Sequence, residues 1–160
     1  MPDTRLSDQL EITRVIQQIA RAYDLKRHDE ILPQVFEAGA KQHYYLMGHF
    51  VDFSMPGGIA LLKHYHDRCY ATQHVVSPPV IDFDGELART TSAVHAIHVQ
   101  VRHDGTQQSW ILGGYYHDIL ARQGGVWRIR ERVAKGTHES GEFLEDVRLF
   151  PTLPSYEETL

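Results

Sequence analysis

The sequence has little of several features that mark large classes of proteins. Cys69 is the only cysteine in 160 residues, so no disulfide can form within the chain, and a cysteine-based zinc site would need a second chain. No run of about 18 apolar residues is present to span a membrane, and the first residues lack the apolar core of a signal peptide. We therefore expect a protein of the reducing cytoplasm with no membrane partner.

Clusters of basic residues are also missing. The 16 Lys and Arg residues are outnumbered by 21 Asp and Glu residues, which gives a net charge of −5, and they form no basic run. Binding to nucleic acid depends on such clusters to neutralise phosphates, so we expect no nucleic-acid partner. With 42% hydrophobic and 23% charged residues the composition is ordinary for a globular protein, and the length suits one domain with one core.

The first part of the chain is predicted to be mainly helical. Apolar residues recur every three or four positions over residues 6–23, which predicts an amphipathic helix of about five turns. Shorter helices are predicted over residues 31–36, with Pro33 in the first turn, and over residues 59–69. Between these two, the aromatic-rich residues 42–53 predict a strand or a hairpin.

From residue 74 onward the pattern changes to extended segments. Asp-Gly pairs at 84–85 and 104–105 and a Gly-Gly pair at 124–125 separate long runs, and this arrangement predicts three successive hairpins. We expect a curved antiparallel sheet of about four long strands plus a short one, with the three N-terminal helices packed on one face. The predicted fold class is therefore α+β.

The segment that begins at residue 139 follows the predicted sheet and is rich in apolar residues. We expect residues 139–160 to form an arm that covers the mouth of a pocket or a neighbouring subunit, and residues 1–138 to form the domain. Burial of the arm against a second copy would give self-association a physical reason. Its apolar residues are Phe143, Leu144, Val147, Leu149 and Phe150.

Two short stretches carry the main chemical hypothesis, Ala22-Tyr23-Asp24 and Thr72-Gln73-His74. If the fold brings Asp24 and His74 together in a closed apolar cavity, the carboxylate would fix one imidazole nitrogen and leave the other as a base at neutral pH. The simpler interpretation is that Asp24 ends a helix and that His74 is a structural residue at the start of a strand. The sequence leaves both interpretations open.

The order of elements and several motifs resemble the SnoaL-like branch of the NTF2-like superfamily. The resemblance covers roughly residues 8 to 136, and its Tyr-Asp and Thr-Gln-His motifs are most similar to the scytalone dehydratase and hexachlorocyclohexane dehydrochlorinase families. The similar stretches are Tyr23 to Phe36, Thr72-Gln73-His74, Phe83-Asp-Gly-Glu-Leu-Ala88, Gly114-Tyr-Tyr-His-Asp118 and Gly125-Val-Trp-Arg-Ile-Arg130. The resemblance implies a cone-shaped α+β barrel, an Asp-His pair deep in the cone, and no metal or organic cofactor.

The resemblance also implies roles for individual residues. Asp24 and His74 would be catalytic, and Tyr23 and Tyr44 would orient the substrate. A second histidine falls near His95 or His98; these two are three positions apart on one strand, so only one can point into the cone. The family often has an Asn after the catalytic His, whereas Ser77-Pro78-Pro79 follows here, so we expect a reshaped pocket entrance.

The remaining histidines give no clear metal-binding pattern. His95 and His98 diverge on a strand, and His64 and His66, two apart on a predicted helix, point in different directions. No metal site is therefore expected. Cys69 is interpreted as a small buried apolar residue, because no base stands beside it in the sequence.

These observations favour a cofactor-independent acid–base enzyme, a lyase (dehydratase or dehydrohalogenase) or isomerase acting on a hydrophobic small molecule. The alternative is a non-catalytic small-molecule-binding or subunit-association protein of the same fold, which a filled cone would favour. A homodimer or homotrimer is expected from the resemblance.

Overall fold

The computed structural model describes residues 4–154. Two helices, α1 (Thr4–Asp24) and α2 (His28–Val35), open the chain, and a third, α3 (Ile59–Asp67), follows the first two strands. The predicted periodicity is confirmed in α1, where Ile12, Ile16 and Ile19 are at most 1% exposed. The second helix begins at His28, earlier than predicted, so Pro33 lies in its interior and not in its first turn.

Seven strands form one mixed sheet. Their bounds are β1 (Phe36–Leu46), β2 (His49–Ser54), β3 (Ala71–Val76), β4 (Val80–Asp84), β5 (Leu87–Val101), β6 (Gln107–Gln123) and β7 (Val126–Ser140). The order across the sheet is β2-β1-β7-β6-β5-β3, with β4 also paired to β5. The α+β class and the three predicted hairpins are confirmed. One pair, β1 with β7, is parallel, and it joins the first strand of the chain to the last strand of the β5–β6–β7 meander.

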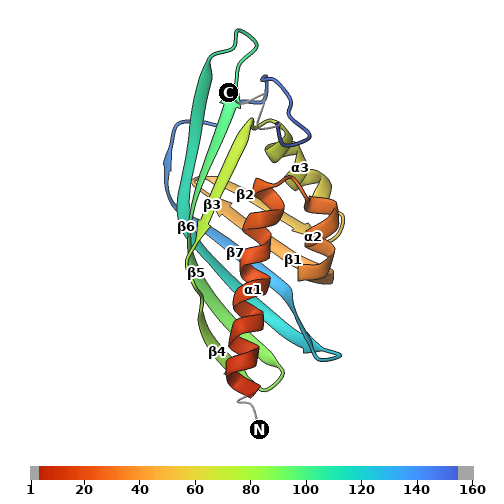
Figure 1. Cartoon of the computed structure of the whole chain (residues 1–160). Coiled ribbons are helices and arrows are strands. Elements are labelled where there is room, and N and C mark those ends of the chain that lie inside the picture. The colour runs from red at the N-terminus through yellow and green to blue at the C-terminus, as the bar shows by residue number, and fades with distance from the viewer. Residues whose placement is uncertain (1–3, 155–160) are drawn as a thin grey trace.

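All three helices lie on one side of the curved sheet (Figure 1). The central contact is made by α1, whose buried isoleucines join a cluster with Leu120 and Ile129 of the sheet. Burial of one such side chain contributes roughly 1.5–3 kcal/mol. The start of α1 is fixed as well, because the indole Nε1 of Trp127 donates to Asp8 Oδ1 at 3.1 Å. The helix is thus held along its length, which fixes where its last residues lie.

A bulge in β7 changes which residues face the interior. Ile119 pairs with Glu131 and Leu120 with Ile129, so Arg130 is an extra residue on β7. The extra residue reverses the alternation of side chains, and Arg132 therefore points inward. Its guanidinium donates to both Asp118 oxygens, at 2.7 and 2.8 Å, and neither side chain is exposed.

The described part of the arm, up to residue 154, packs on its own chain. Val147 is 4% exposed, the ring of Phe143 contacts Trp110 and Tyr65, and Phe150 contacts Tyr70. The apolar residues that we expected to support self-association are therefore largely used within one subunit, apart from Leu149. Residues 155–160 of the predicted arm lie outside the described residues.

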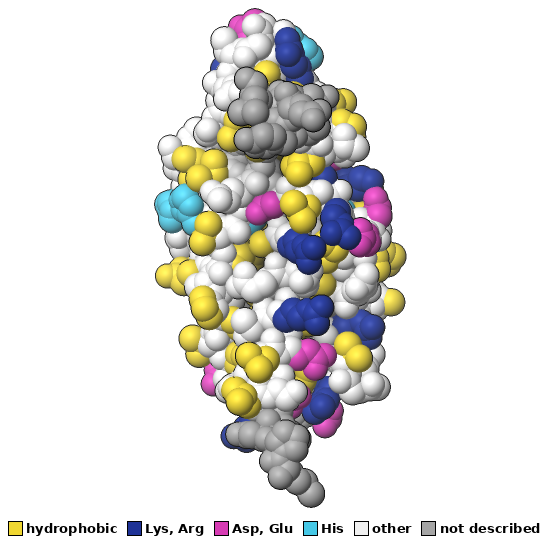
Figure 2. All heavy atoms as spheres, viewed as in Figure 1, with side chains coloured by type: hydrophobic (Ala, Val, Ile, Leu, Met, Phe, Trp, Pro, Cys, Tyr) yellow, Lys and Arg dark blue, Asp and Glu magenta, His cyan; other side chains and the backbone are white. Residues whose placement is uncertain are grey.

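Charges of both signs are mixed on the face that carries α1. Figure 2 shows Lys and Arg side chains beside Asp and Glu side chains, with hydrophobic side chains between them. Leu10 of α1 is one of the exposed apolar residues, at 65%. Within residues 4–154, no helix combines the length and apolar character that crossing a membrane would require.

Candidate active site

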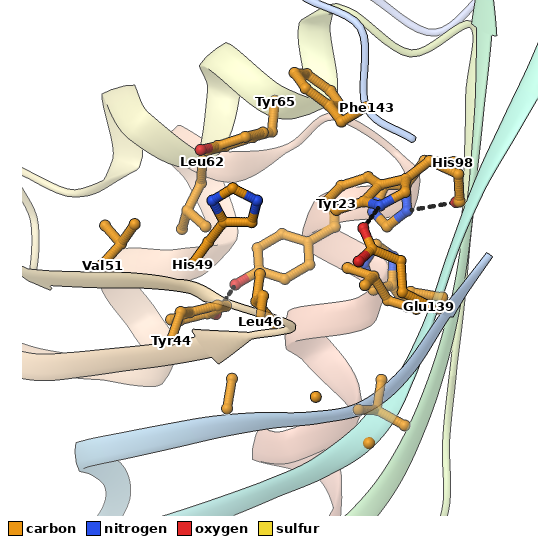
Figure 3. A pocket seen from close by; sticks show the side chains of 18 of the residues that line it. Tyr23, Tyr44, Leu46, His49, Val51, Leu62, Tyr65, His98, Glu139 and Phe143 are labelled. Carbon is orange, nitrogen blue, oxygen red and sulfur yellow. Dashed lines mark hydrogen bonds between the residues drawn. The ribbon is translucent and has the colours of Figure 1, made fainter. Parts of the chain in front are cut away.

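A cavity of about 520 Å³ lies between the sheet, α3 and the arm. This volume is within the range of roughly 300–1,000 Å³ that is usual for small-molecule sites. Its wall is mainly apolar and aromatic, and Figure 3 shows Tyr65 and Phe143 together at one side and Tyr23 and Tyr44 deeper in. The cone is therefore not filled by its own side chains.

Asp24 and His74 are in direct contact at this cavity. The Nδ1 of His74 donates to Asp24 Oδ1 at 2.7 Å, and the backbone N–H of His74 donates to Asp24 Oδ2 at 2.9 Å. The hydroxyl of Thr72 adds a third hydrogen bond, to Oδ1, at 3.0 Å. The carboxylate therefore holds both the backbone and the ring of His74. Because a carboxylate only accepts, the neutral ring keeps its proton on Nδ1 and has its lone pair on Nε2.

The local sequence explains why the two residues meet. Asp24 is the last residue of α1, and α1 is tied to β3 through Gln17, whose Nε2 donates to the carbonyl of Val76 at 3.0 Å. In β3, Gln73 and Val75 are exposed, so Thr72 and His74 face the helix and the cavity. The Thr-Gln-His motif therefore places its first and third residues against the end of α1.

The structure distinguishes between His95 and His98. Thr72 pairs with His98 and His74 with Ala96 across β3 and β5, so His98 is the diagonal neighbour of His74 on the same face. His98 is 4% exposed and lines the cavity. His95 is exposed and stacks on His138, so it is removed from the candidate site.

The two predicted tyrosines also meet in the cavity. The hydroxyls of Tyr23 and Tyr44 are 3.3 Å apart and form the hydrogen bond drawn in Figure 3. Burial raises the pKa of Tyr23 well above its ordinary value, and the neighbouring Tyr44 adds to the shift. Tyr23 therefore stays a neutral hydroxyl at any pH at which the protein works, and the pair can present one hydroxyl to a ligand.

His66 is a cavity residue that was not predicted from the sequence. This residue is 4% exposed, lines the cavity, and its ring packs against Tyr23 at 4.6 Å between centroids. Its Nδ1 is 2.7 Å from Nε2 of His28. The signal was present: Ile59, Leu62 and His66 are the buried residues of α3 and recur at helical spacing. From the sequence, His66 was compared only with His64, which points in a different direction, and so it was not placed on the buried face of the helix.

Burial keeps His66 and His98 uncharged. The pKa of His98 is lowered to about 3, mainly by burial and also by the nearby His74. The pKa of His66 is lowered well below its ordinary value by the same two causes in the same order. His98 donates from Nδ1 to the carbonyl of Trp110 at 3.2 Å, which leaves its Nε2 as an acceptor.

The mouth of the cavity is formed by α3 and the arm. Tyr65, Glu142, Phe143 and Glu145 belong to its wall. The predicted reshaping by residues 77–79 is not what forms this opening, since none of these residues lines the cavity. Behind the site, Nζ of Lys26 donates to the carbonyls of His66 and Cys69, each at 2.7 Å, and to that of Phe150, which joins α3 to the arm.

Several solved structures share this architecture. A protein from Kribbella flavida is 20% identical, with a TM-score of 0.77, and the match covers 85% of this chain and 95% of that one. A provisionally named scytalone dehydratase from Novosphingobium aromaticivorans is 21% identical, with a TM-score of 0.76 and coverage of 93% and 97%. A hexachlorocyclohexane dehydrochlorinase from Novosphingobium barchaimii is 15% identical, with a TM-score of 0.70 and coverage of 85% and 90%. No curated protein matches the sequence.

Three helices on a curved mixed sheet, enclosing an apolar cavity lined by a histidine that is hydrogen-bonded to an aspartate, define an α+β protein of the NTF2-like class. Within that class the chain belongs to the SnoaL-like domain family, whose profile matches residues 4–133. The fold is shared with dehydratases and dehydrochlorinases and also with proteins of unknown function, so the fold alone specifies no reaction.

Proposed function

We propose that the protein is an acid–base enzyme that needs no cofactor, a lyase or an isomerase, and that it removes a C–H proton from a hydrophobic small molecule. The observation that carries this proposal is that His74, which lines an open cavity of about 520 Å³, is hydrogen-bonded from behind by Asp24. The named activities of two structural neighbours, loss of water and loss of HCl, are of the same class.

His74 is the proposed base. Its Nε2 has the lone pair, and proton uptake there produces an imidazolium beside the carboxylate of Asp24. The attraction between the two charges stabilises the protonated ring, and the fixed Nδ1–H keeps the ring oriented. General-base catalysis of this kind contributes about 10²–10⁴-fold.

Removal of the proton leaves an electron pair on carbon, which is stabilised when negative charge moves to a neighbouring oxygen of the substrate. That oxygen needs a hydrogen-bond donor. The Tyr23–Tyr44 pair supplies one, because one hydroxyl donates to the other and the second remains available to the ligand. His98 has the opposite role. Its Nε2 accepts, so it is suited to hold a hydroxyl of the substrate. A hydroxyl that leaves would take the proton that His74 has removed from carbon and depart as water, which returns His74 to its neutral form.

The lining favours an apolar substrate. Leucine, valine and aromatic side chains make up most of the wall, and a cluster of tyrosines and histidines from α1, β1, α3, β3 and β5 forms its polar end. A ring or alkyl body would occupy the apolar part, while a carbonyl or leaving group reaches the tyrosines and histidines.

The second candidate is a binding protein of the same fold without turnover. The cavity favours it equally on volume, because a closed apolar pocket binds ligands whether or not chemistry follows. Only the polar end distinguishes the two, since binding alone does not require a base held by two hydrogen bonds to a carboxylate that accepts a third from Thr72.

The test is proton abstraction itself, since elimination and isomerisation both begin with it. We would incubate the protein in D₂O with hydrophobic ketones that carry a hydroxyl or chloride on the β carbon, and follow deuterium uptake at the α carbon by NMR and enone formation by ultraviolet absorbance. We expect turnover of at least one compound, and a His74→Gln variant about 100-fold slower or worse.

A matched control is His117→Gln, because His117 lies exposed on β6 away from the cavity. It should leave the rate unchanged. If compounds bind in the cavity but show neither exchange nor elimination, the binding-protein interpretation takes first place. If the His74→Gln variant turns over as fast as the wild type, His74 is not the base.

A further inference from the structure

Three imidazole rings from three different elements converge at the polar end of the cavity. His66 comes from α3, His74 from β3 and His98 from β5. One ring nitrogen of each lies within 4.8 Å of those of the other two. The rings of His66 and His98 are nearly parallel, at an interplanar angle of 4°, and that of His74 is perpendicular to them, at 86° and 90°. The acid–base proposal uses His74 and His98 and gives no reason for the third ring.

Each ring is held by a partner on its other nitrogen. Nδ1 of His74 donates to the Asp24 carboxylate, and Nδ1 of His98 donates to the Trp110 carbonyl. Nδ1 of His66 pairs with Nε2 of His28 at 2.7 Å. For His74 and His98 the outer partner is a carboxylate or a backbone carbonyl, which is the arrangement that orients histidine ligands in metal sites. It leaves Nε2 of each ring directed away from its partner.

When Nδ1 of His66 donates to Nε2 of His28, Nε2 of each of the three rings is an acceptor, and no donor from the described residues lies between them. Within residues 4–154, Nε2 of His74 and Nε2 of His98 make no hydrogen bond, and the tautomers fixed above make both of them acceptors. Two acceptors on neighbouring rings are best satisfied by a positive species that accepts both lone pairs at once. The nearest carboxylate, Asp24, supplies one negative charge behind His74 and offsets part of the charge of a cation.

We propose that His66, His74 and His98 form a binding site for a divalent transition-metal ion. Three imidazoles suit zinc, with the fourth position open to the cavity, which all three residues line. In a tetrahedral site with Zn–N bonds of about 2.0–2.1 Å, the nitrogens are about 3.3 Å apart. Small rotations of the rings close the remaining gap from at most 4.8 Å.

Metal binding and base catalysis exclude one another at this site. The ion would take the Nε2 lone pair of His74, which the acid–base mechanism needs free. A bound zinc ion therefore inhibits proton abstraction, and His66 is the residue that gives the cavity this second state. The effect on activity depends on the proposed function, but binding of the metal does not.

Binding is tested with Co²⁺ on tag-free protein that has been treated with a chelator. We expect one Co²⁺ per chain and the intense visible absorption of a four-coordinate ion, which Zn²⁺ then abolishes by displacement. His66→Gln should weaken Co²⁺ binding by more than the roughly 10–100-fold that loss of an outer partner costs, and Asp24→Asn should weaken it within that range. Far-ultraviolet circular dichroism establishes that each variant is folded.

The control is His95→Gln. His95 and His138 stack at 6.1 Å on the outer face and are a rival site for weak binding. This variant should bind Co²⁺ as the wild type does. If His66→Gln and the wild type bind equally, or the wild type gives only the weak spectrum of six-coordinate Co²⁺, the proposal is overturned. A protein that binds Co²⁺ but abstracts no proton would refute the proposed function alone, and the reverse result would refute only the metal site.

Discussion

Replacing Asp24 by asparagine tests the central geometry, because the change keeps the shape of the side chain and removes its charge. Oδ2 accepts the backbone N–H of His74, while Oδ1 accepts from Thr72 and from the His74 ring. The side-chain amide of the Asp24→Asn variant has only one oxygen. If that oxygen stays opposite the backbone N–H, the NH₂ group faces the ring and donates to Nδ1.

That arrangement reverses the tautomer of His74. Nδ1 becomes the acceptor, Nε2 carries the proton, and the base no longer has a lone pair facing the cavity. The opposite placement of the amide leaves two donors face to face at the backbone of His74, which costs about 1–3 kcal/mol. The placement with the amide oxygen opposite the backbone N–H is therefore favoured. It brings with it the inactive tautomer of His74, which has its proton on Nε2.

The expected loss of catalytic rate in Asp24→Asn follows from hydrogen-bond energies. A hydrogen bond to a charged group contributes about 1.5–3 kcal/mol, which corresponds to roughly 10–150-fold, and the wrong tautomer adds to it. We expect kcat to fall by about 10²–10⁴-fold, while the Kd for a hydrophobic ligand changes by less than about threefold because the apolar wall is untouched.

Two measurements check this. Turnover of a compound found in the exchange screen gives the rate, and long-range ¹H–¹⁵N correlation spectra give the tautomer of His74 with no substrate. Thr72→Val is the control, because it removes one hydrogen bond to Asp24 and leaves the charge in place; we expect a loss of at most about tenfold. The reasoning is refuted if wild-type His74 has its proton on Nε2, or if Asp24→Asn retains more than about a tenth of the wild-type rate.

Three further predictions concern stability and reactivity. Burial lowers the pKa of His28 to about 4 and that of His98 to about 3, below the unfolded value of about 6.5. The unfolded state therefore binds more protons below pH 6.5, and the free energy of unfolding should fall as the pH drops from 6.5 toward 4. Urea titrations should show a decrease of up to about 1.4 kcal/mol per pH unit for each group. Burial raises the pKa of Cys69 to about 12, so native protein should resist iodoacetamide at pH 8 and react only after denaturation; rapid native labelling would contradict the buried position. Arg132→Met should cost about 3–5 kcal/mol by leaving Asp118 buried and unpaired, and adding Asp118→Leu should restore most of that loss; equal stability of the single and double variants would argue against the pair.

Local patterns in the sequence determined most of the fold. The three- and four-residue spacing of apolar residues in α1 predicted that helix, because burial of one face requires that spacing. The Asp-Gly and Gly-Gly pairs predicted the turns of three hairpins, where Gly85, Gly105, Gly124 and Gly125 have positive φ. These features depend only on neighbouring residues, so they are readable without the tertiary structure.

The sequence also indicated the Asp24 and His74 pair, but only through the resemblance of two motifs. Nothing in residues 24 and 74 alone specifies their contact, which depends on how α1 lies on β3. Alternation along β5 predicted that His95 and His98 face opposite sides, and the pairing of β5 with β3 was needed to decide that His98 faces inward.

Only the tertiary structure decided three features. The parallel contact of β1 with β7 joins residues about ninety positions apart in the sequence, and no local signal encodes it. One extra residue at the β7 bulge turns Arg132 toward Asp118, against the alternation that the strand would otherwise show. The meeting of His66 with His74 and His98 needs a helix and two strands placed together, so residue spacing along any one of them could not predict it.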